Sequence, residues 1–370
     1  MTVPPRLLFV TTSMDRGGAQ RQIVDLAARL HAAGWPVAVL SMTTPSEYLD
    51  ELDAADVEIA SLHMAPGRPT PAAFARYGRF IRRWKPDIIH SHMVHANLLA
   101  RLGRVFAPRV PVICTVHNVV EGARWREIAY RLTDPLATLT TAVSEAAAER
   151  YVRVGAAPKG RITAFPNGFD FSRPVPDGAR ASIREALEVG DAFLWVTAGR
   201  LDVQKGYDLL LAAFDNVRRS RPDARLVIAG DGPERAVLDG ILARLGLAGC
   251  ATLLGDRQDV PSILAAADGF VLSSRWEGLP MVLLEAAAQG LPIVCTDVGG
   301  DREVARPELG GVLVDVDPGS IAAGMLRVMA MDPAARAAIG AALQEHVRTG
   351  YDMAAVVERW KATYAAVLAR

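Results

Sequence analysis

Short stretches rich in β-branched residues alternate with longer helical patterns along the whole chain. The stretches that we predict as strands are Leu7–Thr11, Val37–Met42, Asp87–Ser91, Val110–Val116, Phe193–Ala198, Leu226–Ala229, Phe270–Ser273 and Ile293–Thr296. Because strands that alternate with helices form parallel sheets covered on both faces, this pattern predicts an α/β protein. The pattern pauses near residues 174–178 and then resumes, so we expect two doubly wound domains that face a central cleft.

The pause and the end of the chain give the predicted domain bounds. We expect a first domain over residues 1–173, a second over residues 174–350 and a terminal helix over residues 351–370. The tripeptide Pro166-Asn167-Gly168 predicts a turn close to the junction. Helical periodicity over Tyr351–Leu368 places Trp360 and Tyr364 on one face.

Composition describes a globular protein with a large aliphatic core, because 51% of the residues are hydrophobic and only 6% are aromatic. No apolar run reaches the roughly 18 residues of a membrane span, and Leu7–Val10 is too short for a signal peptide, so we expect a cytoplasmic protein. The cysteines Cys114, Cys250 and Cys295 are odd in number and far apart, which disfavours a disulfide framework and a zinc site. We expect them to be small buried hydrophobic residues.

Charge is unevenly divided along the chain, although the net charge is zero. Residues 1–173 hold 21 basic and 15 acidic residues, a net charge of +6, and the remainder holds 20 and 26, a net charge of −6. The division favours an anionic partner for the first half, although a chance distribution of solvated surface charge explains it as well. We predict no nucleic-acid partner.

A glycine pair follows the first predicted strand and opens a helix predicted over Ala19–Ala33. Gly17 and Gly18 permit close approach of a ligand and expose N–H groups to an anion. A turn that needs positive φ explains the pair as well. The GxGxxG pattern is absent, which disfavours a nicotinamide-dependent dehydrogenase.

Two cations stand in the loop GRLDVQKG, which follows the predicted strand Phe193–Ala198. Arg200 and Lys205 can neutralise a pyrophosphate leaving group in place of a metal ion, although a surface salt bridge is the simpler interpretation. The chain has only four lysines beside 37 arginines, which makes a lysine at this turn notable. The later turn IAGDGP, residues 228–233, is typical of a structural role.

Two glutamates bracket a predicted helix start in the segment EGLPMVLLE. We expect Glu277 just outside the helix and Glu285 two turns inside it, both directed at one cleft. Gly278, Leu279 and Pro280 then lie at the helix start, where free N–H groups and the helix dipole favour phosphate. Carboxylates on either side of that anion site are suited to binding hydroxyl groups.

The first half offers histidines and the second half an aspartate pair. His117 follows the strand Val110–Val116 directly, although a lone histidine is more often structural. His90, His92 and His95 lack an acidic or cysteine partner, which disfavours a metal site. Asp315-Val316-Asp317 has the form of a metal-binding DxD, but its place before Pro318 predicts helix capping.

In order and spacing these motifs resemble those of the retaining glycosyltransferases of family 4, the glycosyl transferases of group 1. The resemblance covers essentially the whole chain and implies the GT-B fold, in which two Rossmann-like domains face a central cleft. It also implies that the terminal helix crosses back to the first domain. The match of Pro166-Asn167-Gly168 to a similar family tripeptide supports a boundary just after it.

The resemblance assigns donor-binding roles to the second half. It implies that Glu277 contacts sugar hydroxyls and that Glu285 contacts the ribose. Arg200 and Lys205 match the pyrophosphate-binding pair of the family, and the backbone of residues 278–280 would hold sugar and phosphate.

In the first half, the resemblance places His117 beside the donor sugar and the reacting centre. Gly17 and Gly18 would also line the donor site. The family often has a histidine in the cluster around His92, which also disfavours a metal site, and His92 is a candidate for the acceptor pocket.

The function that we predict is transfer of a sugar from a nucleotide diphosphate sugar to an acceptor, in the biosynthesis of a polysaccharide, glycolipid or other glycoconjugate. The resemblance implies retention of anomeric configuration without a metal or other cofactor, and UDP is the default nucleotide. The alternatives are a GT-B-fold sugar phosphorylase or epimerase and a non-catalytic nucleotide-sugar-binding protein. No carboxylate pair suits glycoside hydrolysis. The motifs do not identify the base, the sugar, the acceptor or the oligomeric state.

A basic aromatic segment in the first half raises the hypothesis of peripheral association with an anionic membrane at its inner face. On a helix over residues 71–85, aromatic residues fall on one side and arginines on another. A sheet-packing helix is the favoured interpretation of the aromatic stripe, although the arginines could still attract anionic lipid. A second cluster comprises Arg124, Trp125, Arg126, Tyr130 and Arg131 and could extend the same surface.

Overall fold

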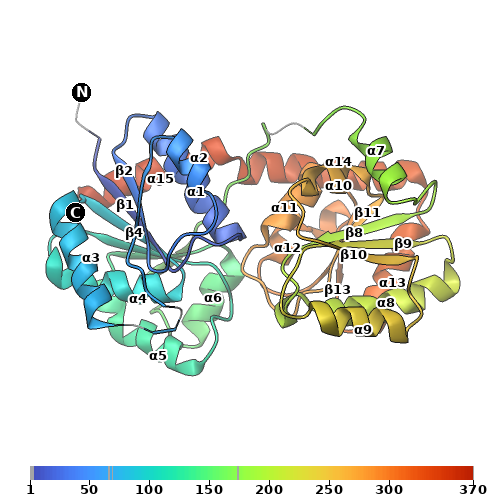
Figure 1. Cartoon of the computed structure of the whole chain (residues 1–370), viewed down its shortest axis with the longest axis horizontal. Coiled ribbons are helices and arrows are strands. Elements are labelled where there is room, and N and C mark those ends of the chain that lie inside the picture. Colours follow the sequence, from blue (N-terminus) through green and yellow to red (C-terminus); the bar gives the residue numbers. More distant parts are fainter. Residues whose placement is uncertain (1–3, 66, 69, 173–174, 370) are drawn as a thin grey trace. The chain divides into compact units, whose positions relative to one another are not determined.

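The computed structural model describes residues 4–65, 67–68, 70–172 and 175–369 and divides into two compact units. One unit comprises Met1–Gly168 together with Met353–Arg370, and the other comprises Phe169–Asp352. The chain therefore leaves the first unit once and returns to it at its end (Figure 1). The boundary predicted between residues 173 and 174 falls on residues outside the described part of the chain.

The described residues of the first unit form a seven-stranded parallel sheet with the order β3-β2-β1-β4-β5-β6-β7. In chain order the strands are β1 (Leu7–Thr11), β2 (Val37–Ser41), β3 (Glu58–Ser61), β4 (Ile88–His92), β5 (Val112–Val116), β6 (Leu139–Ala142) and β7 (Ile162–Ala164). The helices are α1 (Gly18–Ala32), α2 (Leu49–Ala54), α3 (Pro71–Trp84), α4 (Val94–Leu102), α5 (Arg124–Thr133), α6 (Glu145–Arg153) and α15 (Met353–Leu368), with 3-10 turns η1 (Gly103–Phe106) and η2 (Asp134–Leu136).

The described residues of the second unit form a six-stranded parallel sheet with the order β10-β9-β8-β11-β12-β13. Its strands are β8 (Leu194–Ala198), β9 (Arg225–Ala229), β10 (Ala251–Gly255), β11 (Gly269–Leu272), β12 (Ile293–Thr296) and β13 (Val312–Val314). Its helices are α7 (Ala179–Ala186), α8 (Tyr207–Ser220), α9 (Arg235–Arg244), α10 (Val260–Ala266), α11 (Met281–Ala288), α12 (Asp301–Val304), α13 (Pro318–Met329) and α14 (Pro333–Tyr351), with 3-10 turns η3 (Val203–Lys205) and η4 (Pro307–Leu309). The prediction of two doubly wound α/β units is confirmed.

Both faces of the first sheet are packed, and β1 shows why. Its side chains alternate in direction, so Leu7 and Phe9 join one hydrophobic cluster and Leu8 and Val10 join another. All five positions of β1 are buried. This explains why its sequence is a continuous apolar run rather than an alternating one.

The terminal segment of the chain is divided between the units. The helix predicted over Tyr351–Leu368 is interrupted at Asp352, which ends α14 and precedes α15. Trp360 and Tyr364 are buried in the core of the first unit with their ring centroids 5.4 Å apart, which confirms that they share a face of α15. Tyr364 also bonds the sheet, because its hydroxyl lies 2.8 Å from His90 Nδ1.

Helix α3 is a sheet-packing helix, as the aromatic stripe predicted. Tyr77, Phe80 and Trp84 are buried, whereas Arg79 and Arg82 are exposed. The helix therefore contributes its aromatic residues to the core rather than to the surface. Among the described residues, no helix combines the length and the apolar character that crossing a membrane requires.

Candidate functional site

Two loops meet at the carboxyl edge of the second sheet, because β8 and β11 are neighbouring parallel strands. The loop of residues 199–206 follows β8, and the loop of residues 273–280 follows β11. Arg275 N donates to Gln204 O at 2.7 Å, which ties the loops together. Gly206 has φ of 62°, and a Cβ there would lie 2.2 Å from Ser273 O, so only glycine permits this approach.

Glu277 is fixed by hydrogen bonds from both loops. Its Oε1 atom accepts from Lys205 Nζ at 2.6 Å and from Ser274 Oγ at 2.7 Å, and its Oε2 atom accepts from Gln204 Nε2 at 3.1 Å. The residue is 5% exposed. A carboxylate offers about four acceptor positions, so this arrangement orients the group and leaves capacity for one hydroxyl. The sequence did not indicate Gln204 or Ser274 as partners, although each lies within three residues of a predicted site residue.

Lys205 is charged despite its burial. Burial alone would lower the pKa of its ammonium group, but the Glu277 carboxylate beside it outweighs that effect and raises the pKa above the usual value. The ion pair therefore fixes the ammonium group of Lys205 at the strand end. Arg200, the other predicted cation, is exposed on the same loop.

The helix start predicted after Glu277 is present. Pro280 is the N-cap of α11, and Gly278, Leu279 and Pro280 are all buried. Glu285 is the fifth residue of α11, so it lies about one turn inside the helix, and the prediction of two turns was wrong. The error arose because the helix begins after Pro280 rather than at Gly278.

Asp301, on α12, is a neighbour of this site that the motifs did not reveal. The residue is fully buried, and neither of its carboxyl oxygens has a hydrogen-bond partner among the described residues. Burial, followed by the charge of Glu277, raises the pKa of Asp301 well above its usual value, whereas Lys205 acts in the opposite direction. No motif marks this position, because its burial depends on how the loop after β12 packs.

The first unit places two histidines together at the ends of β4 and β5, which are paired strands. His92 Nδ1 lies 2.9 Å from His117 Nε2. His92 is 1% exposed, and burial lowers its pKa well below the usual value. Burial also lowers the pKa of His117 to about 4, so both rings are neutral at pH 7.

His90 belongs to the sheet rather than to a metal site. Its Nδ1 atom lies 2.8 Å from the hydroxyl of Tyr364, and its Nε2 atom lies 2.7 Å from Thr115 Oγ1. Both ring nitrogens are therefore used within the core. Within the described ranges, no group of three His, Cys, Asp or Glu side chains is arranged to hold a metal ion.

The glycine pair begins α1, with Gly17 as its N-cap and Gly18 as its first residue. Gly17 has φ of −179°, an extended backbone that any residue adopts, so the alternative of a turn with positive φ was wrong here. A Cβ at Gly17 would lie 2.6 Å from Gln20 Oε1, so contact with that flexible side chain is what limits the position.

Glu121 is a second acid that the sequence did not indicate, and it is partly buried. It lies four residues beyond His117, and its Oε2 atom is buried without a hydrogen-bond partner among the described residues. Burial raises the pKa of Glu121 to about 7, while hydrogen bonds from Tyr151, from the His117 backbone and from Tyr130 act in the opposite direction. The acid therefore titrates in the physiological range.

The other candidates have structural roles. Asp317 caps α13, because its Oδ2 atom accepts from Ser320 N at 2.9 Å, as predicted. The cysteines are free and buried, also as predicted. In the turn predicted as structural, a Cβ at Gly230 would lie 2.0 Å from Gly199 O, which confirms a close backbone contact.

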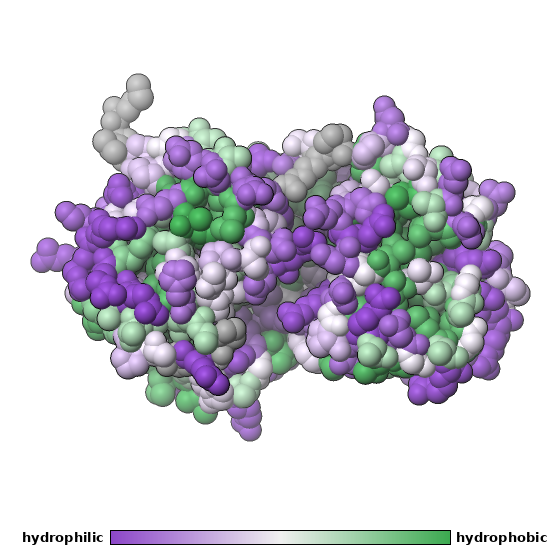
Figure 2. Space-filling model, viewed as in Figure 1, coloured by the Kyte–Doolittle hydropathy of each residue, from purple (hydrophilic) through white to green (hydrophobic). Residues whose placement is uncertain are grey.

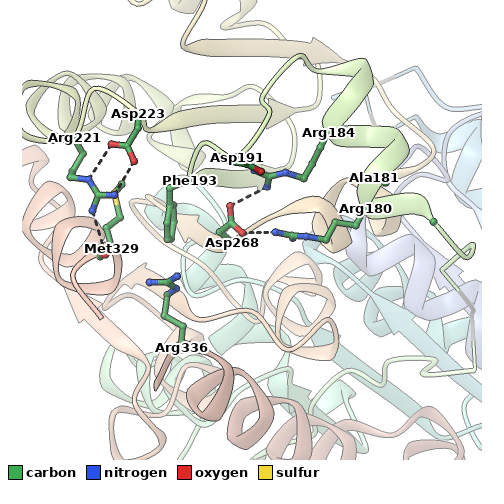
Figure 3. Close-up of a pocket in the computed structure, with 11 residues that line it drawn as sticks. Arg180, Ala181, Arg184, Asp191, Phe193, Arg221, Asp223, Asp268, Met329 and Arg336 are labelled. Atoms are coloured by element: carbon green, nitrogen blue, oxygen red, sulfur yellow. Dashed lines mark hydrogen bonds and ion pairs between the residues drawn. The ribbon is translucent and has the colours of Figure 1, made fainter. Parts of the chain in front are cut away.

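A hollow of about 670 Å³ lies at the amino-terminal edge of the second sheet, away from the strand ends described above (Figure 3). The arginines that line it are Arg180, Arg184, Arg221 and Arg336. Arg180 and Arg184 both pair with Asp268 and donate to Ala266 O near the end of α10. The helix dipole places partial negative charge at a helix C-terminus, so arginines at that end neutralise the charge of the helix itself. We therefore interpret this cluster as structural.

Two family models match successive parts of the chain. The model described as "Glycosyltransferase Family 4" matches residues 16–173, and the model described as "Glycosyl transferases group 1" matches residues 179–345. The boundary between them lies close to the division between the two compact units.

Curated relatives and solved structures agree with these models. The chain is 30% identical over 260 residues to an Escherichia coli UDP-Gal:alpha-D-GlcNAc-diphosphoundecaprenol alpha-1,3-galactosyltransferase, which covers 65% of each protein, a little under two thirds. It is 28% identical over 391 residues to the glycogen synthase of Mycobacterium tuberculosis, covering 95% of this chain and 91% of that enzyme. The crystal structure of Anabaena HepE with UDP-glucose matches with a TM-score of 0.86 at 21% identity, covering 98% of this chain and 100% of that one. The chain therefore has the GT-B fold and belongs to the family 4 glycosyltransferases, the glycosyl transferases of group 1.

Proposed function

We propose that this protein is a retaining, metal-independent glycosyltransferase that moves a sugar from a nucleotide diphosphate sugar to an acceptor. The observation that carries the proposal is the buried pair of Lys205 and Glu277, which combines a fixed cation with an oriented carboxylate at neighbouring strand ends. The relatives support UDP as the nucleotide, since UDP is named for the Escherichia coli enzyme and is bound in HepE.

The two cations of the loop after β8 serve the leaving group. As the bond from the sugar to the diphosphate breaks, negative charge accumulates on the phosphate oxygens. Lys205, kept protonated by Glu277, and Arg200, on the same loop, stabilise that charge without a metal ion. The N–H groups before α11 add to the stabilisation.

The two glutamates select the rest of the donor. Glu277 has acceptor capacity left after its three hydrogen bonds, and it accepts from a hydroxyl of the sugar. Glu285, about one turn further into α11, accepts from the ribose. Gly278, Leu279 and Pro280 lie between them and contact sugar and phosphate through the backbone.

The first unit, in this proposal, is the acceptor side. His117 lies beside the donor sugar and the reacting centre, and Gly17 and Gly18 approach the donor from the start of α1. His92, a candidate for the acceptor pocket, is buried, and its ring contacts the ring of His117 directly. The second unit, by contrast, is the nucleotide-sugar side.

Retention follows when the acceptor oxygen attacks the anomeric carbon from the face that the diphosphate leaves. The bond between the anomeric carbon and the phosphate oxygen breaks, and the bond to the acceptor oxygen forms. The proton of the acceptor hydroxyl passes to the departing phosphate oxygen. No charged side-chain base is needed for that transfer, which agrees with the neutral histidines at the strand ends of the first unit.

A panel of radiolabelled UDP-, GDP- and ADP-sugars tests the proposal. We expect hydrolysis or transfer with one nucleotide, activity that survives EDTA, and a product with the donor's anomeric configuration. An epimerase would alter the nucleotide sugar without an acceptor, a phosphorylase would need inorganic phosphate, and a silent binding protein would turn over nothing. Loss of activity with EDTA and its recovery with manganese would overturn the metal-free mechanism.

We also propose that the first unit associates peripherally with an anionic membrane, as a cytoplasmic protein at its inner face. On α3 the aromatic stripe is core, whereas Arg79, Arg82 and Arg83 are exposed, and α5 adds exposed apolar residues to the basic ones. Trp125, Ile128 and Leu132 lie on one face of α5, at 54%, 57% and 74% exposure. Figure 2 shows hydrophobic and hydrophilic residues intermixed on the part of the first unit where Figure 1 labels α5. Arg124 and Arg131 are exposed on the same helix, whereas Tyr130 of the predicted cluster is buried.

Sedimentation with liposomes tests this association. Each surface arginine contributes about 1 kcal/mol near anionic lipid, so binding is expected to liposomes that contain phosphatidylglycerol and to weaken at high salt. A Trp125→Ser, Leu132→Ser double variant should bind less, and Val237→Ser, which removes an exposed apolar residue of the second unit, should not. Equal binding by all variants would contradict a role for α5.

A further inference from the structure

Asp301 is a buried carboxyl group that the proposed transfer does not use. It is the first residue of α12 and has an exposed fraction of 0%. Neither Oδ1 nor Oδ2 has a hydrogen-bond partner among the described residues. A buried carboxylate without partners is strongly disfavoured, so the presence of this group requires an explanation.

The loop that carries Asp301 is packed against the Glu277 loop by its backbone. Gly300 N donates to Gly278 O at 3.0 Å. Gly299 has φ of 58°, and a Cβ there would lie 1.8 Å from Glu277 O, so only glycine allows the two loops to approach so closely. The carboxyl of Asp301 is thereby held within electrostatic range of both Glu277 and Lys205.

We propose that Asp301 is a positioning residue of the donor site, which acts on the bound diphosphate through Lys205. The inference rests on the donor-binding role proposed above for that site. The ammonium of Lys205 has three N–H donors, and Glu277 takes one of them. A neutral Asp301 leaves the remaining N–H donors of Lys205 to the diphosphate. An ionised Asp301 is a second carboxylate that competes for the same ammonium and repels the diphosphate.

The charged groups that face Asp301 determine which form is present. Burial and the charge of Glu277 raise the pKa of Asp301 well above its usual value, Asp297 acts in the same direction, and Lys205 opposes them. The thiol of Cys295 also faces this carboxyl, and burial together with Asp301 raises its pKa. An acid with a raised pKa stays neutral to higher pH, so ionisation of Asp301 begins only as the pH rises.

Titration calorimetry with UDP from pH 6 to pH 9 tests the inference on the full chain. Asp301→Asn removes the titration and keeps the shape of the side chain. We expect the two proteins to bind UDP within about twofold at pH 6 and the wild type to be roughly tenfold weaker than the variant at pH 9. The phosphate of UDP titrates alike with both proteins, so it cancels in the ratio of their dissociation constants.

Asp239→Asn is the matched control, because Asp239 is an exposed carboxylate of the same unit that pairs with Arg235 and is not among the groups that act on Asp301. Its UDP affinity should follow that of the wild type at every pH. Should Asp301→Asn fail to show a cooperative thermal transition, Asp301→Ser takes its place with the same expectation.

Parallel pH curves for the wild type and Asp301→Asn would overturn the inference and leave the donor site intact. An equal change in Asp239→Asn would overturn it too, because the effect would then be a general one of charge. Absence of UDP binding by the wild type at every pH would contradict the proposed function, and with it this inference.

Discussion

At the ends of β8 and β11 the second unit holds a buried ion pair, whereas at the ends of β4 and β5 the first unit holds two neutral histidines. Both sites are built in the same way, from loops that follow paired parallel strands. In the second unit the Glu277 carboxylate keeps Lys205 charged despite burial. In the first unit no carboxylate pairs with the histidines among the described residues, and burial leaves them uncharged.

The two sites offer a ligand different interactions, because the second unit offers charge and the first offers hydrogen bonds. A buried ion pair provides a field that an anion can use, but removal of either partner leaves an uncompensated charge. Neutral imidazoles donate and accept hydrogen bonds without attracting an anion, and they lose that character when acid protonates them. The second unit is therefore suited to a diphosphate and the first to a hydroxyl group.

The largest effect that we expect is on stability, from Lys205→Met. Breaking a buried ion pair on one side leaves Glu277 as an unpaired buried charge, which destabilises by about 3 to 5 kcal/mol. Denaturant unfolding, followed through the transition of the second unit, measures it. Arg235→Met is the control, because Arg235 pairs with Asp239 at the surface and should change stability by about 0 to 1 kcal/mol. If the two variants lost similar free energies of unfolding, burial of the Lys205 ion pair would not be what makes it important for stability.

The next largest effect is on transfer, from Glu277→Gln. Loss of one charge-assisted contact of about 1.5 to 3 kcal/mol lowers kcat/KM by roughly 10- to 100-fold. Steady-state kinetics with the preferred donor measures the change. Glu308→Gln, at an exposed position of the same unit, should leave kcat/KM unaltered. Unchanged kinetics in Glu277→Gln would remove this residue from the site.

Acid should destabilise the first unit through its histidines. His117 has a folded pKa of about 4, below the usual 6.5. Its contribution to the free energy of unfolding is therefore present above pH 6.5 and is lost as the pH falls towards 4. Between pH 7 and pH 5 this contribution falls by about 2 kcal/mol. His117→Asn removes it, so the variant should lose less stability than the wild type over that interval. Equal losses would mean that His117 is charged in the folded protein.

Glu121 should act in the opposite direction on the same unit. Its folded pKa of about 7 lies above the usual 4.5. Its favourable contribution to the free energy of unfolding is therefore present below pH 4.5 and is lost as the pH rises through 7. Glu121→Gln should therefore be more stable relative to the wild type at pH 8 than at pH 6, by roughly 1 to 2 kcal/mol. Glu149→Gln, at an exposed position on α6, should show no such change. A flat difference for Glu121→Gln would place its pKa near the ordinary value.

Most inner strands were predictable because their apolar runs reflect burial on both faces, but the inner strand β6, with the sequence LTTA, was missed. The edge strands were not predictable, since β3 begins with an exposed glutamate and β7 and β13 have only three residues each. Such short strands depend on pairing with a neighbour rather than on their own sequence. The predicted strands nearest the site, including β8 and β11, differ from the observed ones by a residue at their ends.

The candidate site was predictable where residues lie in one motif and not where packing joins separate ones. Glu277 and Gly278 could be identified from a single segment. The 2.6 Å contact between Lys205 and Glu277, which lie 72 residues apart, depends on the adjacency of β8 and β11. Asp301 is buried only because Gly299 lets its loop approach Glu277, and no local pattern indicates that.

The most direct test of this difference between the two units is a calorimetric titration of UDP in the presence of EDTA. The proteins to titrate are the wild type, Lys205→Met and His117→Asn. If charge for the diphosphate comes from the second unit, the wild type binds UDP without metal and Lys205→Met binds it at least tenfold more weakly. His117→Asn should bind UDP within about twofold of the wild type, because a neutral imidazole contributes no charge to the diphosphate. Binding of UDP that requires manganese, or that weakens equally in both variants, would contradict the account.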